Sequence, residues 1–145
     1  MILLDPQLIA DVKGAEGCKF AAYKDTVGVW TIAYGHTGPE VVEGLTCNQA
    51  EADAWLDIDL SNAYAFAQQL HEWPKLDTPC RQNAVAELCF NMHSRWLKFT
   101  ETRACIWIQN WQGAHDGLLD SVWATQVGPT RSNRLANYLL TGAYT

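Results

Sequence analysis

The sequence has no run of apolar residues that approaches the length of a membrane span, which needs about 18 of them. At the N-terminus, only the first four residues are apolar, and no basic stretch precedes them. A secretory signal peptide begins with such a basic stretch, so we expect neither a signal peptide nor a signal anchor. The sequence therefore predicts a protein that is made in the cytoplasm and has no stable membrane association.

Basic residues are too few to balance the acidic ones. Ten Lys and Arg residues stand against 16 Asp and Glu residues, which gives a formal net charge of −6. A surface with this balance repels phosphate backbones, so nucleic-acid binding is not expected as the main function. The 145 residues are 48% hydrophobic, which is typical of a globular chain with a core of its own. We expect a single domain and a monomer.

Motifs for metal and cofactor chemistry are also lacking. No two of the five cysteines have the close spacing of zinc or redox motifs, and the four histidines are scattered. An activated-serine turn, a phosphate loop, a dinucleotide fingerprint and a zinc-protease helix are absent as well. We expect no metal and no cofactor. We also expect the thiols to be reduced and mostly buried, and the alternative that one disulfide forms after release stays open. The cysteines are Cys18, Cys47, Cys80, Cys89 and Cys105.

The signals that are present predict an α+β fold with one small sheet near the N-terminus. Asp5 and Pro6 are typical of a helix start, and Gly17 is typical of the residue that follows a helix end. Strand formers interrupted by turn formers then predict a β-hairpin within residues 20–34.

The rest of the chain is predicted to be helical. Thr46 and Gln49 fit a capping box, which would start a long helix over residues 46–70. Thr78 and Pro79 start another helix, which we expect to be the most buried of all. Shorter helices are predicted over residues 101–112, 114–124 and 129–140, the last one closed by Gly142.

These elements predict one domain over residues 1–145 with two lobes. A small lobe spans about residues 15–45, and the helix over about 46–70 connects it to a helical lobe over about 74–145. The first helix, within residues 1–14, is expected to pack on the helical lobe.

Three polar residues near the N-terminus are candidates for catalysis. Glu16 lies at a predicted helix end, Asp25 at the hairpin turn, and Thr31 on the following strand. A helix end packed on a hairpin would aim all three side chains into one cleft. Two carboxylates that flank a cleft are what glycosidic bond cleavage requires, one as a proton donor and the other ionised. Taken alone, a solvated helix-end Glu and an ordinary turn Asp explain the same residues.

The spacing of these residues gives the pattern more weight, because eight residues separate Glu16 from Asp25 and five separate Asp25 from Thr31. The chain thereby closely resembles the phage lysozymes, or endolysins, of glycoside hydrolase family 24, which cleave bacterial peptidoglycan. The resemblance continues in order along essentially the whole chain. It runs through Thr46 to Leu60, Ala84 to Met92, Lys98 to Thr100, Trp123, Gly128 to Arg134, and Leu140 to Tyr144.

The resemblance implies a lysozyme-like fold and a role for each catalytic candidate. Glu16 would be the general acid, Asp25 the second carboxylate, and Thr31 the residue that helps to place the water. The bond cleaved would be the β-1,4 bond between N-acetylmuramic acid and N-acetylglucosamine in peptidoglycan, with lysis of the host cell. A separate holin would release the protein from the host cytoplasm, and it would then act on the wall in the periplasm.

Four further residues are candidates for substrate binding or support. In the last predicted helix Arg131 shares a face with Leu135, so it points inward and needs a carboxylate partner. The matching Arg of the family pairs with the catalytic Glu, which implies a contact between Arg131 and Glu16. Trp30 adjoins Thr31 and is a candidate for sugar contact. The supporting candidates are Arg131, His36, Trp30 and Phe90.

One position departs from the family pattern. The family usually has Gly where this chain has His93, and a structural role for that histidine is expected.

Two other functions are compatible with the same fold. A lytic transglycosylase uses one carboxylate and closes the product on itself, and Asp25 together with Thr31 argues against it. A non-catalytic wall-binding module would be a decayed lysozyme, whereas all three catalytic candidates are present. The hydroxyl of Thr31 can orient a water, so we expect an inverting hydrolase.

Overall fold

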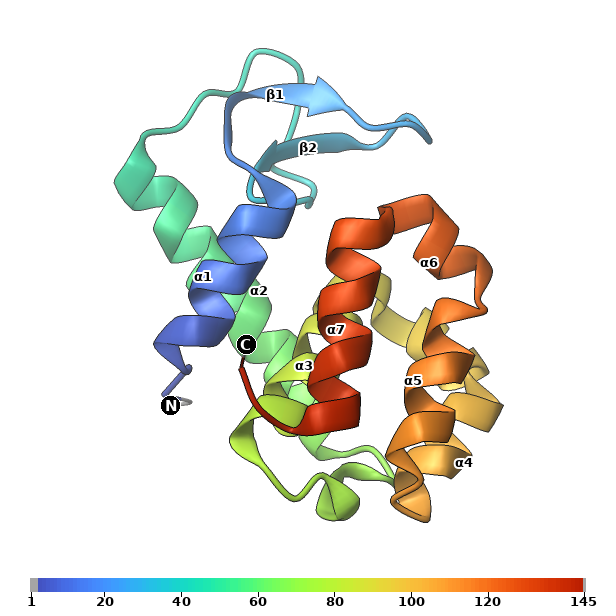
Figure 1. Ribbon diagram of the computed structural model, residues 1–145. Coiled ribbons are helices and arrows are strands. Elements are labelled where there is room, and N and C mark those ends of the chain that lie inside the picture. The colour runs from blue at the N-terminus through green and yellow to red at the C-terminus, as the bar shows by residue number, and fades with distance from the viewer. Residues whose placement is uncertain (1–2, 145) are drawn as a thin grey trace. The chain divides into compact units, whose positions relative to one another are not determined.

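The computed structural model describes residues 3–144 and has the predicted α+β architecture, with one antiparallel hairpin and otherwise helices (Figure 1). The chain divides into two compact units, residues 1–62 and residues 63–145. Within residues 3–144, none of the helices combines the length and the apolar character of a membrane span.

The first unit begins with helix α1, Pro6–Glu16. The side chain of Asp5 accepts a hydrogen bond from the backbone N–H of Gln7 at 2.9 Å, as expected of an N-cap. Gly17 follows the helix with a φ of 66°, a conformation that favours glycine. The predicted start and end of this helix are confirmed, and the end leaves Glu16 on the last helical turn.

The hairpin pairs β1, Lys19–Lys24, with β2, Trp30–Ala33. Tyr23 lies opposite Thr31, and Lys24 lies opposite Trp30. The predicted hairpin is confirmed.

Helix α2, Gln49–Gln68, begins later than the sequence predicts. Thr46 forms a β-bridge with Ala21 and lies two residues before the residue that precedes the helix, Asn48. The capping box is instead formed by Asn48 and Glu51, each of which accepts a hydrogen bond from the other's backbone N–H. The prediction of Thr46 and Gln49 as the capping pair is therefore wrong.

The second unit is built around α3, Pro79–Met92, which packs against α7, Pro129–Thr141. Thr78 caps α3 through its hydroxyl, and 11 of the 14 helical residues are buried. The predicted start and deep burial of this helix are confirmed. Short 3-10 helices precede and follow it, η1 at Trp73–Lys75 and η2 at His93–Lys98.

The helices between α3 and α7 are divided differently from the prediction. They are α4, Thr100–Trp107, α5, Trp111–Leu119, and α6, Val122–Val127. Gln109 has a φ of 56°, and Asn110 caps α5 by accepting a hydrogen bond from Gly113. A helix over 101–112 is therefore interrupted. Ser121 caps α6 in the same way and interrupts the predicted helix over 114–124.

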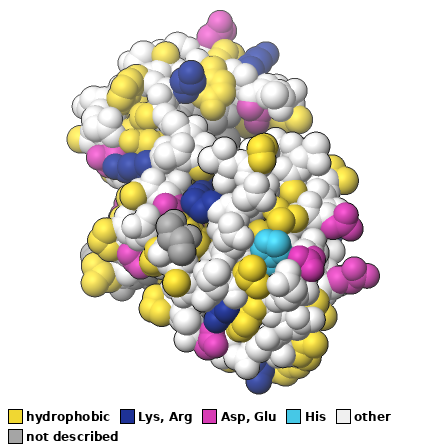
Figure 2. All heavy atoms as spheres, in the orientation of Figure 1, with side chains coloured by type: hydrophobic (Ala, Val, Ile, Leu, Met, Phe, Trp, Pro, Cys, Tyr) yellow, Lys and Arg dark blue, Asp and Glu magenta, His cyan; other side chains and the backbone are white. Residues whose placement is uncertain are grey.

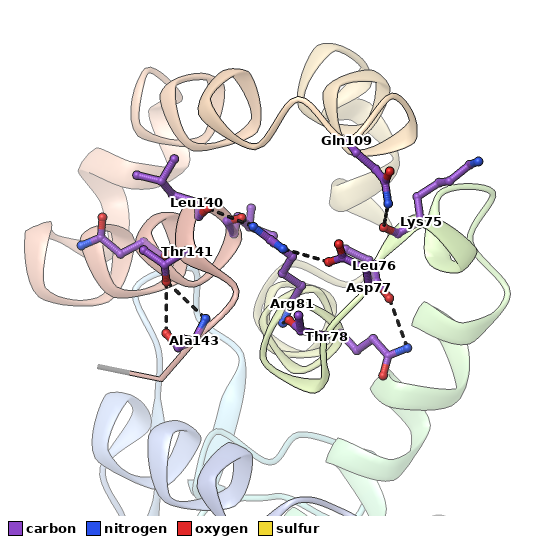
Figure 3. Close-up of polar contacts among 12 residues, drawn as sticks. Lys75, Leu76, Asp77, Thr78, Arg81, Gln109, Leu140, Thr141 and Ala143 are labelled. Atoms are coloured by element: carbon purple, nitrogen blue, oxygen red, sulfur yellow. Dashed lines mark hydrogen bonds and ion pairs between the residues drawn. The ribbon is translucent and has the colours of Figure 1, made fainter.

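The end of α7 is held by Arg81 from the first turn of α3 (Figure 3). Its guanidinium donates to the backbone carbonyls of Leu139 and Leu140, which lie in the last turn of α7. It also pairs with Asp77 at 2.8 Å. Gly142 follows with a φ of 70°, as predicted for the residue that closes this helix.

No disulfide joins the five cysteines in the described structure, and only Cys80 and Cys89 are buried. Burial raises the pKa of the Cys89 thiol to about 12, so this thiol stays protonated and unreactive. The other three are half-buried, so the expectation of mostly buried thiols is wrong for them.

Candidate active site

Glu16 occupies a confined place at the C-terminal end of α1. Gly17 turns the chain immediately after it. The loop after β2 approaches its carboxylate so closely that a Cβ atom on Gly35 would lie 3.1 Å from Glu16 Oε2. Gly35 also has a φ of 77°, so its identity is favoured twice, by conformation and by space.

Asp25 is fixed by the turn of its own hairpin. Its Oδ1 atom accepts hydrogen bonds from the backbone N–H groups of Val27, at 3.0 Å, and Val29, at 2.9 Å. Its own backbone N–H donates to the carbonyl of Val29. Within residues 3–144 the carboxylate is thus hydrogen-bonded by backbone groups only, in the manner of an Asx-turn.

Thr31 is buried, and its hydroxyl has a defined orientation. The hydroxyl donates to the backbone carbonyl of Val29 at 3.0 Å. Its proton is therefore already used, and the remaining lone pairs of Oγ1 are available to accept a hydrogen bond.

The strand register places Asp25 and Thr31 on the same face of the hairpin. Tyr23 is paired with Thr31, and Asp25 continues the ladder opposite Val29. Because side chains alternate between faces along a strand, Tyr23, Asp25 and Thr31 all lie on one face. The structure thus brings together two of the three predicted catalytic residues through the hairpin itself.

Tyr23 connects this face to Glu16. Burial raises the pKa of the Tyr23 phenol, and the negative charges of Glu16 and Asp25 raise it further. Both carboxylates therefore act on one phenol group. Tyr23 is missing from the predicted site residues, although the alternation of β1 places it two residues before Asp25 and on the same face.

Trp30 does not share this face. It is paired with Lys24, whose Nζ atom lies 5.5 Å from the centroid of the indole ring. Both residues alternate with the catalytic candidates along their strands, so they project from the opposite side of the hairpin.

His36 anchors the loop after β2 to α2. Its Nδ1 and Nε2 atoms lie 2.6 Å from carboxylate oxygens of Asp59 and Glu40, respectively, and its ring stacks on Trp55. Burial lowers the pKa of His36, but the hydrogen bonds with Asp59 and Glu40 outweigh it and raise the pKa above its usual value. His36 therefore supports the loop that contains Gly35, next to Glu16.

Phe90 and Arg131 belong to the second unit. Phe90 is buried on α3, and Arg131 donates from Nε to Glu87 at 3.0 Å. Glu87 is only 1% exposed and also accepts two hydrogen bonds from Arg134. The inward Arg131 thus has a carboxylate partner within its own unit that sequence reasoning missed. A contact between Arg131 and Glu16 joins the two units and stays a prediction.

His93 is exposed rather than part of a core, and its backbone has a φ of 54° and a ψ of −132°. Few residues other than glycine adopt this conformation. This fits the glycine that the resembling family usually has at this position.

Figure 2 shows how the charged side chains are distributed on one face of the molecule. On the face shown in Figure 2, basic and acidic side chains are interspersed with apolar ones. Among residues 3–144, no group of three or more His, Cys, Asp or Glu side chains is arranged to hold a metal ion.

Comparisons with known proteins assign the chain to a family. The sequence model of the phage lysozyme family matches residues 13–134. The chain is 39% identical over 80 residues to a SAR-endolysin of Enterobacteria phage P21, which covers 54% of this chain and 47% of that protein. It is 42% identical over 66 residues to a SAR-endolysin of Enterobacteria phage PA-2, covering 46% and 38%. An endolysin of Lactococcus phage c2 is 45% identical over 56 residues, covering 37% and 24%. In these alignments the chain spans less than half the length of each relative.

Proposed function

Because the chain belongs to the phage lysozyme family, we propose that it is an endolysin-type muramidase. Its reaction is hydrolysis of the β-1,4 bond between N-acetylmuramic acid and N-acetylglucosamine in bacterial peptidoglycan, and its consequence is lysis of the host cell. No metal or organic cofactor takes part, since two carboxylates and a water suffice for this chemistry.

The observation that carries the proposal is the shared face of the hairpin. Asp25 is held by backbone N–H groups, Thr31 is buried with its hydroxyl oriented, and both project from the same side. Glu16 lies close enough for its charge to act on Tyr23 of that face. Two carboxylates and an oriented hydroxyl are what acid-assisted attack by water requires.

In the proposed reaction, Glu16 donates its proton to the leaving glycosidic oxygen. A water attacks the anomeric carbon, and Asp25 accepts one of its protons. The second proton of the water points to Thr31 Oγ1, which can accept it because the Thr31 proton is donated to Val29. The lone pair of the water is then aimed at the sugar.

This arrangement is that of an inverting hydrolase. An inverting enzyme keeps its carboxyl groups roughly 6.5–9.5 Å apart to leave room for the water, whereas a retaining enzyme brings them to about 5 Å. Proton NMR of the first product therefore tests the role of Thr31. An initial α-anomer supports it, and an initial β-anomer overturns it.

The remaining candidates are proposed to support the site. Arg131 is proposed to act by binding a carboxylate side chain. His36 is proposed to act by supporting the loop that approaches Glu16. Trp30 and Phe90 support the hairpin and α3, since one is paired with Lys24 and the other is buried.

The proposed partner is peptidoglycan, and the proposed active form is a monomer. Access to the wall in the periplasm would depend on a separate holin after synthesis in the host cytoplasm. Relatives named SAR-endolysins and endolysins support a place at the end of a phage infection.

The decisive experiment measures clearing of a turbid suspension of purified cell walls. Glu16→Gln keeps the shape of the side chain and removes the transferable proton, so we expect the rate to fall by about a hundredfold or more. Glu43→Gln is the matched control, because Glu43 is an exposed acidic residue of the same unit.

A folded Glu16→Gln protein that kept more than about a tenth of the wild-type rate would overturn the assignment. Mass spectrometry of the products separates the other functions. An anhydro-sugar end would identify a lytic transglycosylase, and binding without any product would identify a wall-binding module.

A further inference from the structure

Tyr23 is the one aromatic residue that the register of the hairpin places on the face of Asp25 and Thr31 within β1 and β2. It is directly opposite Thr31 in the ladder and two residues before Asp25. Directly opposed side chains on one face have Cβ atoms about 4.5–5.5 Å apart. The side chain of Tyr23 thus begins next to that of Thr31, whose hydroxyl orients the attacking water in the proposed reaction.

The hydroxyl of Tyr23 forms no hydrogen bond within the described part of its own unit. Among residues 3–62, no side chain or backbone group forms a hydrogen bond with it, whereas the hydroxyl of Tyr34 accepts one from Gln49. Tyr23 is also 38% exposed, and it lies on the face of the hairpin that carries Asp25 and Thr31. A ring that is partly packed and ends in an accessible hydroxyl is suited to contact a ligand.

The electrostatic surroundings define what kind of group this hydroxyl can meet. Burial and the charges of Glu16 and Asp25 raise the Tyr23 pKa above its usual value near 10, so the phenol is neutral at any physiological pH. It is therefore a hydrogen-bond donor and not an acid or base of the reaction. Two nearby carboxyl groups disfavour an anionic partner, so a neutral acceptor is favoured.

We propose that the Tyr23 hydroxyl donates a hydrogen bond to the acetamido carbonyl of the sugar bound over the hairpin, so that Tyr23 recognises N-acetylated glycan. This inference rests on the proposed function, because it assumes that the glycan lies on the face of Asp25 and Thr31. A neutral donor paired with a neutral carbonyl suits a site whose charges are reserved for the reaction. The acetamido group is the feature that distinguishes these sugars from unsubstituted ones.

The test compares glycan binding with and without both partners of the bond. Cosedimentation with purified peptidoglycan sacculi is measured in the Glu16→Gln background, so that the wall is not digested. Tyr23→Phe removes the hydroxyl and keeps the ring, and enzymatically N-deacetylated sacculi lack the acetyl group. Deacetylated sacculi that are chemically re-acetylated control for damage to the wall.

We expect Tyr23→Phe to weaken binding to native and re-acetylated sacculi by about fivefold to tenfold, the effect of one hydrogen bond. On deacetylated sacculi the same change is expected to have no effect, because the partner is already missing. Tyr34→Phe, which makes the same chemical change in the same unit, is expected to leave the binding of all three preparations unchanged.

Equal binding by the Tyr23→Phe and parent proteins on native sacculi would overturn the inference, as would an equal loss on native and deacetylated sacculi. These outcomes differ from failure of the proposed function. The proposed function would fail if the Glu16→Gln protein, without any change at Tyr23, still cleared the wall. That result does not depend on how strongly the Tyr23→Phe protein binds.

Discussion

Carboxylates have opposite surroundings in the two units. In the first unit, Asp25 is half-buried and its carboxylate is held by two backbone N–H groups. In the second, Glu87 is almost fully buried and is bound by the guanidinium groups of Arg131 and Arg134. A carboxylate fixed by backbone keeps an oxygen for chemistry, whereas one enclosed by cations is committed to holding helices together.

Glu72 extends this comparison within the second unit. It is 1% exposed, accepts two hydrogen bonds from Arg103 at 2.9 Å, and accepts a third from the indole N–H of Trp96. Two buried carboxylates therefore serve the packing of the helical unit. When single carboxylates are neutralised, we therefore expect the loss of stability to be larger in the second unit and the loss of catalysis to be larger in the first.

The largest effect is expected from Glu87→Gln. Neutralising this residue leaves the guanidinium groups of Arg131 and Arg134 without their buried counter-ion, which should lower the free energy of unfolding by about 3–5 kcal/mol. The matched change Asp25→Asn should alter it by less than about 1 kcal/mol, because Asn can accept the same backbone hydrogen bonds. Urea denaturation measures both.

Wall clearing should show the reverse order. Asp25→Asn is expected to lose about a hundredfold or more in rate, since the proposed base is gone. Comparable loss of stability in the two variants would contradict the comparison between the units.

The second prediction concerns the pH dependence of the His36 contacts. The folded-state pKa of His36 is raised above the unfolded value of about 6.5, so its contribution to stability is fully present below that pH. It is lost as the pH rises through the folded pKa. The difference in unfolding free energy between wild type and His36→Gln should therefore shrink as the pH is raised from about 6.

Gln68→Ala provides the control, because Gln68 is an exposed residue of α2 without a titratable side chain. Its difference from wild type should not vary with pH over the same range. A difference in unfolding free energy between wild type and His36→Gln that grew with pH would contradict the assignment of a raised pKa to His36.

The third prediction is that Gly35→Ala impairs both stability and activity. The left-handed φ alone should cost about 1–2 kcal/mol of unfolding free energy for a residue with a Cβ atom. That Cβ atom would also press on Glu16 Oε2, so the clearing rate should fall beyond what the lost stability explains. Gly44→Ala also has a positive φ but no atom within 4 Å of the added Cβ, so it isolates the conformational cost.

The smallest effect is expected from His93→Gly. Glycine relieves a backbone conformation that costs a histidine about 1–3 kcal/mol, although it adds entropy to the unfolded chain. A net gain of about 1 kcal/mol is expected in thermal or urea unfolding, with unchanged wall clearing. A less stable variant would show that the histidine side chain itself contributes to the fold.

Local signals predicted those parts of the fold that local chemistry controls. The Asp5 cap, the hairpin within 20–34 and the Thr78 start of α3 all follow from residues adjacent in sequence. The predicted start of α2 was wrong because Asn48 and Glu51 form the capping box, whereas Thr46 pairs with Ala21, a residue distant in sequence.

The same limit applies to the candidate site. The spacing of Glu16, Asp25 and Thr31 could be read from the sequence because all three lie on consecutive elements of one unit. Glu87 could not be matched to Arg131 by spacing, since the two lie 44 positions apart in the sequence. One signal was available: Glu87 is the single acidic residue in a helix of otherwise buried character, and an inward Arg131 requires an inward acid.

The turn that holds Asp25 also defines which sequences can vary around it. The carboxylate uses the amide hydrogens of residues 27 and 29 and not their side chains. In a randomised library selected for wall clearing, position 27 should therefore tolerate almost any amino acid, in keeping with an exposed fraction of 80% for Val27. Proline, which has no amide hydrogen, should be missing from both positions. The side chains next to a catalytic residue can thus vary freely during evolution, although proline is excluded.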